Sequence, residues 1–505
     1  ELTEMAPESA LKQTENGEFE EVDVDEVDVG DILLVKTGAK VPVDGTVLSG
    51  EGHINEASIT GEAVPVGKKK DSQVYAGTIL ENGTIQIVAD RVGEDTTFGR
   101  IIELVEEAQD SKSEAERFID RFSKYYTPAV LVLSSIVWLI SRDVELAITI
   151  LVLGCPGALV IGVPVSNVAG IGNGARHGVL LKGSEVIHDF SKVDTVVFDK
   201  TGTLTIGNPK VADKEIYTNN ADEVLSYLAS VESESDHPLA KAVVEHIGDT
   251  KAYTVEKTDV VKGGGIVAHI DGHRVAVGNA ALMEQEGVHL DEKALADIAR
   301  FEENGNSLVL TSVDGELKAL MGIRDQIRPG VKEDLQRLKK LGVKNLVLLS
   351  GDNQGTVDLV ARELGLTEAH GHMLPEDKSA YIKELQAKGQ IVAFVGDGVN
   401  DSPSIALAQI GIAMGSGTDA AIETSDIVLM NSDFSRLPHA LGLTKATANN
   451  MRQNIVIAVG VVLVLLASVF FSEWMNMSIG MLVHEASILA VILNGMRLLS
   501  YRLRY

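Results

Sequence analysis

The acidic residue Asp199 opens a short turn whose residue types suit covalent chemistry on a phosphoryl group. It follows the β-prone run 195–198 (Thr-Val-Val-Phe) and begins the heptapeptide Asp-Lys-Thr-Gly-Thr-Leu-Thr. A carboxylate delivered to the carboxyl end of a strand can attack a phosphoryl group and hold it as an acyl phosphate, which divides one difficult transfer into two easier steps. The pattern predicts that Asp199 is a nucleophile; an ordinary surface turn is the alternative.

A nucleophile of this kind needs partners, because the transition state of phosphoryl transfer is surrounded by negative oxygens. Later segments offer carboxylates for Mg²⁺ and a lysine for the phosphoryl oxygens: Ser-Gly-Asp at 350–352, Pro-Glu-Asp-Lys at 375–378 and Gly-Asp-Gly-Val-Asn-Asp at 396–401. The first and third of these follow apolar runs. The alternation of strands and helices therefore predicts a doubly wound α/β sheet whose strand ends share one crevice.

The segments 199–205 and 396–401 resemble, without gaps, the phosphorylation and hinge signatures of the P-type ATPases. The chain is identified as a member of their heavy-metal-transporting group. This resemblance implies that ATP phosphorylates Asp199, that Asp199, the Thr201 carbonyl and Asp397 bind Mg²⁺, and that Lys378 neutralises phosphate charge. It also implies catalytic roles for Lys200, Thr203, Asp352, Asn400 and Asp401.

A small β-rich domain is predicted over residues 22–93, where turn residues separate short Val/Ile-rich runs. It contains the loop Thr60-Gly61-Glu62. A glutamate on a glycine-hinged turn can accept a proton from water while the backbone approaches a phosphate. By resemblance this loop belongs to an actuator domain, in which Glu62 promotes hydrolysis of the phosphorylated aspartate; a plain hairpin turn is the alternative.

The insertion between residues 207 and 322 carries a second constellation. Its spacing resembles the ATP pocket of heavy-metal pumps, with Asp236 where glutamate is more usual; the residues concerned are Glu232, His237, Gly263, Gly265 and Asn279. His237 can stack on or hydrogen-bond to adenine, and the glycines let the backbone approach the base and the triphosphate. A structural histidine is the alternative for His237 alone.

Four apolar stretches, 128–140, 146–165, 455–471 and 479–499, form two predicted membrane hairpins. A spanning helix needs about 20 apolar residues, so the first stretch must recruit Tyr125 and its neighbours, and a buried soluble hairpin is its alternative. An amphipathic helix is expected over 97–124. Basic residues flank the hairpins on the side of the large polar segments, which places the catalytic domains in the cytoplasm of a multi-pass membrane protein; they are Arg117, Arg121, Lys124, Arg452, Arg497, Arg502 and Arg504.

A candidate site for a transported ion lies inside these spans. Cys155 precedes Pro156, which unwinds a membrane helix locally, and the pair His484 and Glu485 interrupts the fourth span. Thiolate, imidazole and carboxylate together suit a borderline divalent cation. The alternative is that His484 and Glu485 only pack between helices, and for Met481 a packing role is favoured over a ligand role.

The resemblance also narrows the choice of transported ion. Gly157 replaces the second thiolate of the usual Cys-Pro-Cys triplet, which disfavours copper(I). The pair His484-Glu485, ahead of Asn494, resembles the His-Glu motif of the pumps for cobalt, zinc or iron, although Ala486 and Ser487 replace the usual glycines of that motif. The third span has no lysine, unlike the zinc and cadmium branch. The resemblance is best to the cobalt, zinc and iron branch, with Zn²⁺, Co²⁺, Fe²⁺ or Cd²⁺ as candidate ions and manganese also open.

Composition agrees with an acidic membrane protein. The 505 residues carry a net charge of −29, which disfavours nucleic-acid binding, and a hydrophobic content of 45% that is high for a soluble chain. The single cysteine excludes an internal disulfide. The chain lacks an initiating Met, and because related pumps carry further membrane helices before the actuator domain, we expect the sequence to be part of a longer protein. We expect a monomer.

The predicted fold is a multidomain membrane protein with a β-rich actuator domain, transmembrane α-helices, and a haloacid dehalogenase-like phosphorylation domain that carries an inserted α+β nucleotide-binding domain. The predicted segments are 1–98 (actuator), 99–186 (linker helix and hairpin), 187–206 and 323–444 (phosphorylation domain), 207–322 (nucleotide domain) and 445–505 (hairpin). The function expected from them is ATP-driven export of a divalent transition metal through an aspartyl phosphate. The alternatives are a membrane-anchored haloacid dehalogenase-type phosphatase and a metal-sensing subunit.

Overall fold

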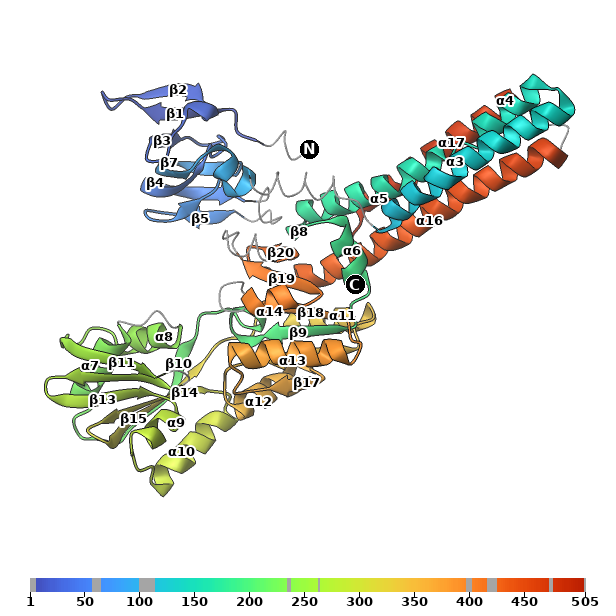
Figure 1. Cartoon of the computed structure of the whole chain (residues 1–505). Helices are drawn as coiled ribbons and strands as arrows, with labels where there is room; N and C mark the ends of the chain where they lie inside the picture. Colours follow the sequence, from blue (N-terminus) through green and yellow to red (C-terminus); the bar gives the residue numbers. More distant parts are fainter. Residues whose placement is uncertain are drawn as a thin grey trace. The chain divides into compact units, whose positions relative to one another are not determined.

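The computed structural model describes residues 6–56, 65–99, 114–233, 238–261, 264–396, 402–415, 425–471 and 476–503. The chain divides into two compact units, residues 1–192 with 415–505, and residues 193–414. The first unit contains the N-terminal β-domain and the apolar helices. The second contains the α/β domain with its insertion (Figure 1).

The N-terminal domain is an antiparallel sheet with the strand order β2-β1-β3-β7-β4-β5 and with β6 paired to β4. Its strands are β1 (Ser9–Gln13), β2 (Phe19–Asp23), β3 (Ile32–Val35), β4 (Asp44–Asn55), β5 (Val66–Lys68), β6 (Gln73–Val74) and β7 (Ile79–Arg91). Apolar side chains of β3, β4 and β7 fill the core. The sheet begins before residue 22, where the sequence prediction placed its start, because the edge hairpin β1–β2 is polar and lacks an apolar alternation.

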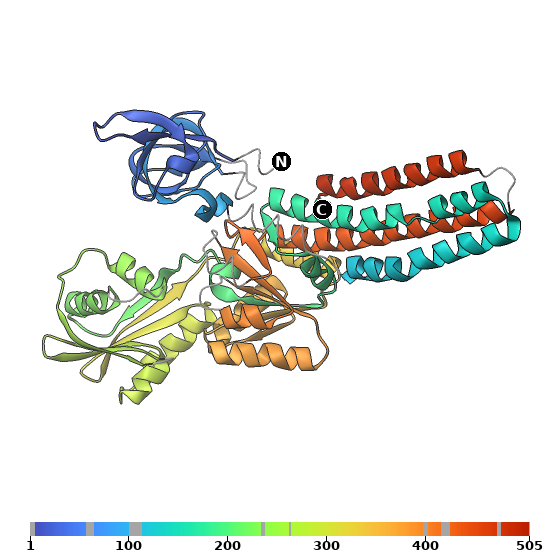
Figure 2. The same cartoon turned by 45° about the horizontal axis from the view of Figure 1, so that its top comes forward.

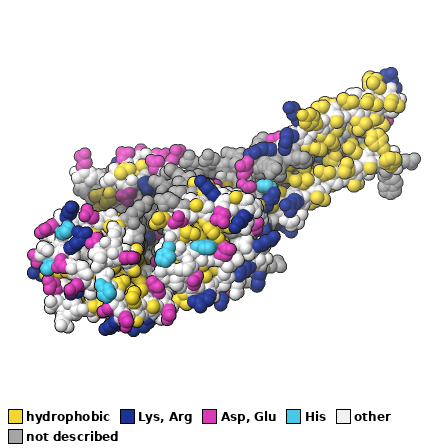
Figure 3. Space-filling model, turned by 60° about the horizontal axis from the view of Figure 1, so that its bottom comes forward, with side chains coloured by type: hydrophobic (Ala, Val, Ile, Leu, Met, Phe, Trp, Pro, Cys, Tyr) yellow, Lys and Arg dark blue, Asp and Glu magenta, His cyan; other side chains and the backbone are white. Residues whose placement is uncertain are grey.

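Four helical segments are long and apolar enough to cross a membrane within the described residues: Ile119–Ser141, Val144–Arg176, Arg436–Phe471 and Met477–Ser500. The helices are α3 (Glu114–Ser141), α4 (Val144–Leu153), α5 (Gly157–Arg176), α16 (Arg436–Phe471) and α17 (Met477–Met496). They lie side by side, with α5 packed against both α16 and α17 (Figures 1 and 2). Figure 3 shows hydrophobic side chains covering this helical part of the surface.

The helix ends differ from the predicted apolar runs in an informative way. α3 extends well before residue 128, so the short first stretch is completed by polar and aromatic residues, as its length required. The predicted helix 97–124 falls partly on residues 100–113, which lie outside the described part. Pro156 separates α4 from α5, which matches the predicted local unwinding. After α5, β8 (Val179–Leu181) pairs with β20 (Ile427–Met430), and α6 (Ser184–Ser191) packs on α16.

The second unit is built on a parallel sheet in the order β17-β16-β9-β18-β19. The strands are β9 (Thr195–Asp199), β16 (Asn345–Leu349), β17 (Glu368–His370), β18 (Val392–Gly396) and β19 (Ile410–Gly415); the helices are α11 (Val331–Lys340), α12 (Gln354–Leu364), α13 (Pro375–Ala387) and α14 (Ser402–Leu407). β9, β16 and β18 are almost wholly buried, which explains their continuous apolar sequences. Side chains of α13 and α14 pack against one face of these strands.

The insertion forms its own antiparallel sheet in the order β10-β15-β14-β13-β12-β11. The strands are β10 (Lys210–Ile216), β11 (Val255–Val261), β12 (Gly265–Ile270), β13 (His273–Gly278), β14 (Ser307–Val313) and β15 (Glu316–Arg324); the helices are α7 (Ala221–Glu232), α8 (Pro238–Ile247), α9 (Ala280–Gln285) and α10 (Glu292–Glu303). One cluster of apolar side chains joins the sheet to α7 and α8, and a second joins it to α9 and α10. The insertion is thus an α+β domain with helices on both faces.

Candidate active site

Asp199 is the last residue of β9, at the edge where the parallel strands β16 and β18 also end. Its Oδ1 accepts hydrogen bonds from the backbone N–H of Lys200 at 2.9 Å and from Lys378 Nζ at 3.1 Å. Both donors stabilise the charged carboxylate. The chain then makes an irregular turn over 200–204, in which Gly202 adopts a φ of 78° that favours glycine.

Lys200 is only 5% exposed and donates from Nζ to Asp352 Oδ2 at 2.5 Å. The predicted residues Asp199, Lys200, Asp352 and Lys378 are therefore brought together at one sheet edge. Thr203 is fully buried close to them in sequence, and its Oγ1 has no hydrogen-bond partner among the described residues. Six other predicted residues lie outside the described part of the chain: Thr60, Gly61, Glu62, Asp397, Asn400 and Asp401.

Asp325 and Arg328 lie where the chain re-enters the α/β domain after the insertion, and they stabilise the turn that follows Asp199. Asp325 accepts hydrogen bonds from Thr205 Oγ1 at 2.6 Å and from the backbone N–H groups of Gly207 and Asn208. Arg328 donates to the carbonyl oxygen of Gly202 at 2.8 Å. Neither side chain was predicted from the sequence, although an acidic residue directly after a strand, with a basic residue three positions later, was a visible signal.

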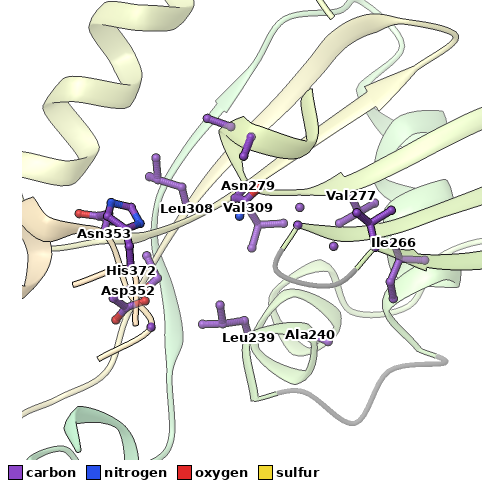
Figure 4. A pocket seen from close by; sticks show the side chains of 18 of the residues that line it. Leu239, Ala240, Ile266, Val277, Asn279, Leu308, Val309, Asp352, Asn353 and His372 are labelled. Atoms are coloured by element: carbon purple, nitrogen blue, oxygen red, sulfur yellow. Dashed lines mark hydrogen bonds between the residues drawn. The ribbon is translucent and has the colours of Figure 1, made fainter. Parts of the chain in front are cut away.

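A cavity of about 760 Å³ lies between the sheet of the insertion and the loop after β16. Figure 4 shows Asp352, Asn353 and His372 at one end and Ile266 and Val277 at the other. Of the predicted nucleotide residues, the lining contains Glu232, Gly265 and Asn279; His237 and Gly263 lie outside the described residues. Several other lining residues were not predicted from the sequence, because they come from elements that only the fold brings together; they include Leu239, Glu302, Ser307, Asn353 and His372.

The wall of the cavity depends on glycine. A Cβ at Gly265 would lie 2.1 Å from the carbonyl oxygen of Val277, and one at Gly278 would lie 2.0 Å from that of Gly264. Asn279 caps α9 by accepting from the backbone N–H of Leu282 at 2.9 Å. Glu232 is 7% exposed, and its burial raises its pKa to about 7. The cavity therefore offers close backbone approach at one end and a carboxyl group that can be neutral near pH 7.

The predicted ion residues lie around the break between α4 and α5. His484 is 8% exposed and faces Gly157, since a Cβ there would lie 3.3 Å from His484 Nε2. Its Nδ1 is buried with no hydrogen-bond partner in the described part. Cys155 and Glu485 are exposed, and no group of three or more His, Cys, Asp or Glu side chains in the described residues is arranged to hold a metal ion. The structure thus brings His484 to the break without assembling the three predicted ligands into one cluster.

Comparison with known proteins decides the family. P-type ATPase actuator domains match residues 4–106, and haloacid dehalogenase-like hydrolases match residues 193–409. A probable cadmium-transporting ATPase of Staphylococcus aureus (strain MRSA252) is 37% identical over 99% of this chain and 71% of its own length. The chain belongs to the heavy-metal-transporting P-type ATPases. A copper-exporting P-type ATPase of Legionella pneumophila is 40% identical to this ATPase, over 90% of the present chain and 64% of the relative's own length.

A solved structure agrees with this assignment. A zinc-transporting PIB-type ATPase in an E2.Pi state is 34% identical to this ATPase, with a TM-score of 0.59 over 99% of this chain and 83% of the other. Membership confirms the predicted family, the multidomain fold and the enzyme class. It also confirms a membrane protein whose catalytic domains are cytoplasmic.

Proposed function

We propose that this ATPase exports a divalent transition-metal cation through a phosphorylated Asp199. The observation that carries the proposal is the set of contacts at the end of β9: Lys378 Nζ lies 3.1 Å from Asp199, and Lys200 lies next to it in contact with Asp352. These lysines supply positive charge where negative charge develops on the transferred group. The relatives, named as cadmium-, copper- and zinc-transporting ATPases, support a heavy metal as the ion.

In the proposed cycle, ATP lies in the cavity between Glu232 and Asp352, and a carboxylate oxygen of Asp199 attacks its γ-phosphorus while ADP leaves. Oxygen donors from Asp199, the Thr201 carbonyl and Asp397 suit Mg²⁺, which supplies charge neutralisation when bound. Lys378 stabilises the phosphoryl oxygens, and Thr203, Asn400 and Asp401 orient the group. Water then releases phosphate, with Glu62 accepting its proton and Thr60 and Gly61 shaping the loop. The domain boundaries given by the sequence are part of this proposal.

The ion proposal rests on Cys155, His484 and Glu485. His484 already faces the helix break beside Pro156, and its imidazole has an unpartnered nitrogen within the described structure. Sulfur, nitrogen and oxygen donors favour Zn²⁺, Co²⁺, Fe²⁺ or Cd²⁺ over copper(I). The family assignment does not favour a membrane-anchored phosphatase or a sensing subunit.

The test of the phosphoenzyme uses radiolabelled ATP and the full-length protein. We expect an acid-stable, hydroxylamine-sensitive label on the wild type and none on Asp199→Asn, because an amide cannot act as the nucleophile. Lys12→Ala, on the partly exposed strand β1 of the β-domain, is the control and should label normally. Absence of label from the wild type, or equal label on Asp199→Asn, would contradict the proposal.

A further inference from the structure

The corner where α10 leads into β14 ties the inserted domain to the start of α12. The carbonyl oxygen of Asn306 accepts hydrogen bonds from Thr356 Oγ1 at 2.8 Å and from Asn353 Nδ2 at 3.2 Å. Asn306 is fully buried, and Thr356 is also fully buried. Because buried hydrogen bonds of this kind are costly to leave unmade, they fix Asn306, the residue before β14, against the start of α12 and the loop that carries Asp352.

The next residue of this corner, Ser307, reaches the phosphorylation machinery. Its hydroxyl donates to Asp352 Oδ1 at 2.6 Å, while Lys200 donates to the other oxygen, Oδ2, at 2.5 Å. Ser307 is 7% exposed and Lys200 is 5% exposed. Hydrogen bonds to a charged group are stronger than neutral ones, and they gain strength where water is scarce.

The two contacts together fix the orientation of the Asp352 carboxylate. The terminal torsion of an aspartate is broad, so a single partner leaves the carboxylate free to rotate. Ser307 on one oxygen and Lys200 on the other leave one favourable arrangement. Lys200 directly follows Asp199 in the chain and donates to Asp352, so the orientation of Asp352 sets the position of the Lys200 ammonium within the turn that begins at the nucleophile.

Ser307 also lines the nucleotide cavity, as do Asp352 and Glu232. A single hydroxyl on the first residue of β14 therefore touches both the space for nucleotide and the carboxylate that holds Lys200. We propose that Ser307 is a positioning residue for phosphoryl transfer, which acts through Asp352 to hold Lys200 beside Asp199. This inference rests on the proposed phosphorylation of Asp199.

The test compares Ser307→Ala with Ser307→Thr in the full-length ATPase, by the rate of phosphoenzyme formation at saturating ATP and by the ATP concentration at half-maximal rate. Ser307→Ala should slow the maximal rate about ten- to 150-fold, which corresponds to the loss of one hydrogen bond to a charged group. The half-saturating ATP concentration should change less than twofold. Ser307→Thr keeps the hydroxyl and should restore most of the rate.

Ser312→Ala is the matched control, because Ser312 is a buried serine on the same strand and is not among the residues that line the cavity. It should leave both quantities unchanged. A Ser307→Ala variant with a normal maximal rate, one that only weakens ATP binding, or a Ser307→Thr variant as slow as Ser307→Ala would each overturn the inference while the phosphoenzyme still forms. A wild type that forms no phosphoenzyme would overturn the proposed function together with it.

Discussion

Glu232 shows how the fold changes the chemistry of a single residue. It ends α7, and it lies buried in the wall of the nucleotide cavity rather than in water. Burial disfavours the charged form of a carboxyl group, so its pKa rises from 4.5 to about 7. When Glu232 is neutral, the domain avoids the free-energy cost of burying a charged carboxylate. Because the fraction of neutral Glu232 changes with pH, the stability of the folded domain also changes with pH.

The sign of this dependence follows from proton binding. Between the unfolded pKa of 4.5 and the folded pKa of about 7, the folded state binds more protons, so the free energy of unfolding falls as pH rises. Glu232→Gln removes this loss of stability at higher pH, because a glutamine side chain does not ionise. We expect the variant to be more stable than the wild type by up to about 3 kcal/mol at pH 8, with little difference at pH 4.5.

Scanning calorimetry without nucleotide at several pH values measures this effect. Glu292→Gln is the control, since Glu292 is exposed on α10 of the same domain and should show no change. A difference between Glu232→Gln and wild type that stays constant from pH 5 to pH 8 would refute the assignment of the raised pKa to this carboxyl group.

Elements that pack in the membrane are joined by side-chain amides. Asn454 of α16 donates from Nδ2 to the carbonyl oxygens of Gly162 in α5 at 2.8 Å and Val491 in α17 at 3.2 Å. Its Oδ1 accepts from Asn494 at 2.9 Å. Asn454 is 1% exposed, so these bonds form away from solvent. One side chain thus connects three helices. Of these, α5 begins just after Cys155, and α17 carries His484 and Glu485.

Asn454→Leu should loosen this junction. The substitution removes the donors and adds branched volume, and polar contacts between membrane helices contribute about 0.6–2 kcal/mol. We expect a lower thermal unfolding midpoint in detergent and faster protease cleavage of the helical part. Asn449→Leu, on an exposed position of α16, is the control. Equal midpoints for Asn454→Leu and the control would show that the amide contributes nothing to the junction.

The elements also show what the sequence can predict. A strand followed by Asp199, a proline break at Pro156 and apolar runs of sufficient length are local signals, and each corresponds to an observed feature. The polar hairpin β1–β2 has no such signal, because its edge strands bury little. Ser307 was missed for another reason: a serine at the start of a strand is common, and its contact with Asp352 bridges residues far apart in the chain.

At the scale of the whole molecule, a pump requires that ion binding in the membrane and phosphorylation in the cytoplasm bias one another. Binding of a ligand shifts a conformational equilibrium only by its differential affinity for the two states, and the coupling between two binding equilibria is reciprocal. The predicted ion residues and Asp199 lie in different units of the chain. Loss of an ion ligand should therefore change metal-dependent turnover without changing the nucleotide cavity.

His484→Ala and Cys155→Ala test this separation in the full-length ATPase. Each should lower the bound metal per protein and abolish stimulation of ATP hydrolysis by Zn²⁺, Co²⁺, Fe²⁺ or Cd²⁺, because each removes a donor from the proposed site. Nucleotide affinity measured without added metal should stay within about twofold of the wild type, because the coupling between the two sites acts only when metal is bound. Met481→Leu is the control, because Met481 is 45% exposed on the same helix as His484. The sequence favoured a packing role for Met481, but the structure does not bury this side chain in a core. Metal stoichiometry by elemental analysis and ATPase assays measure both quantities. If His484→Ala binds and responds to metal like the wild type, the ion site lies elsewhere in the protein, while phosphorylation of Asp199 would be untouched by that result.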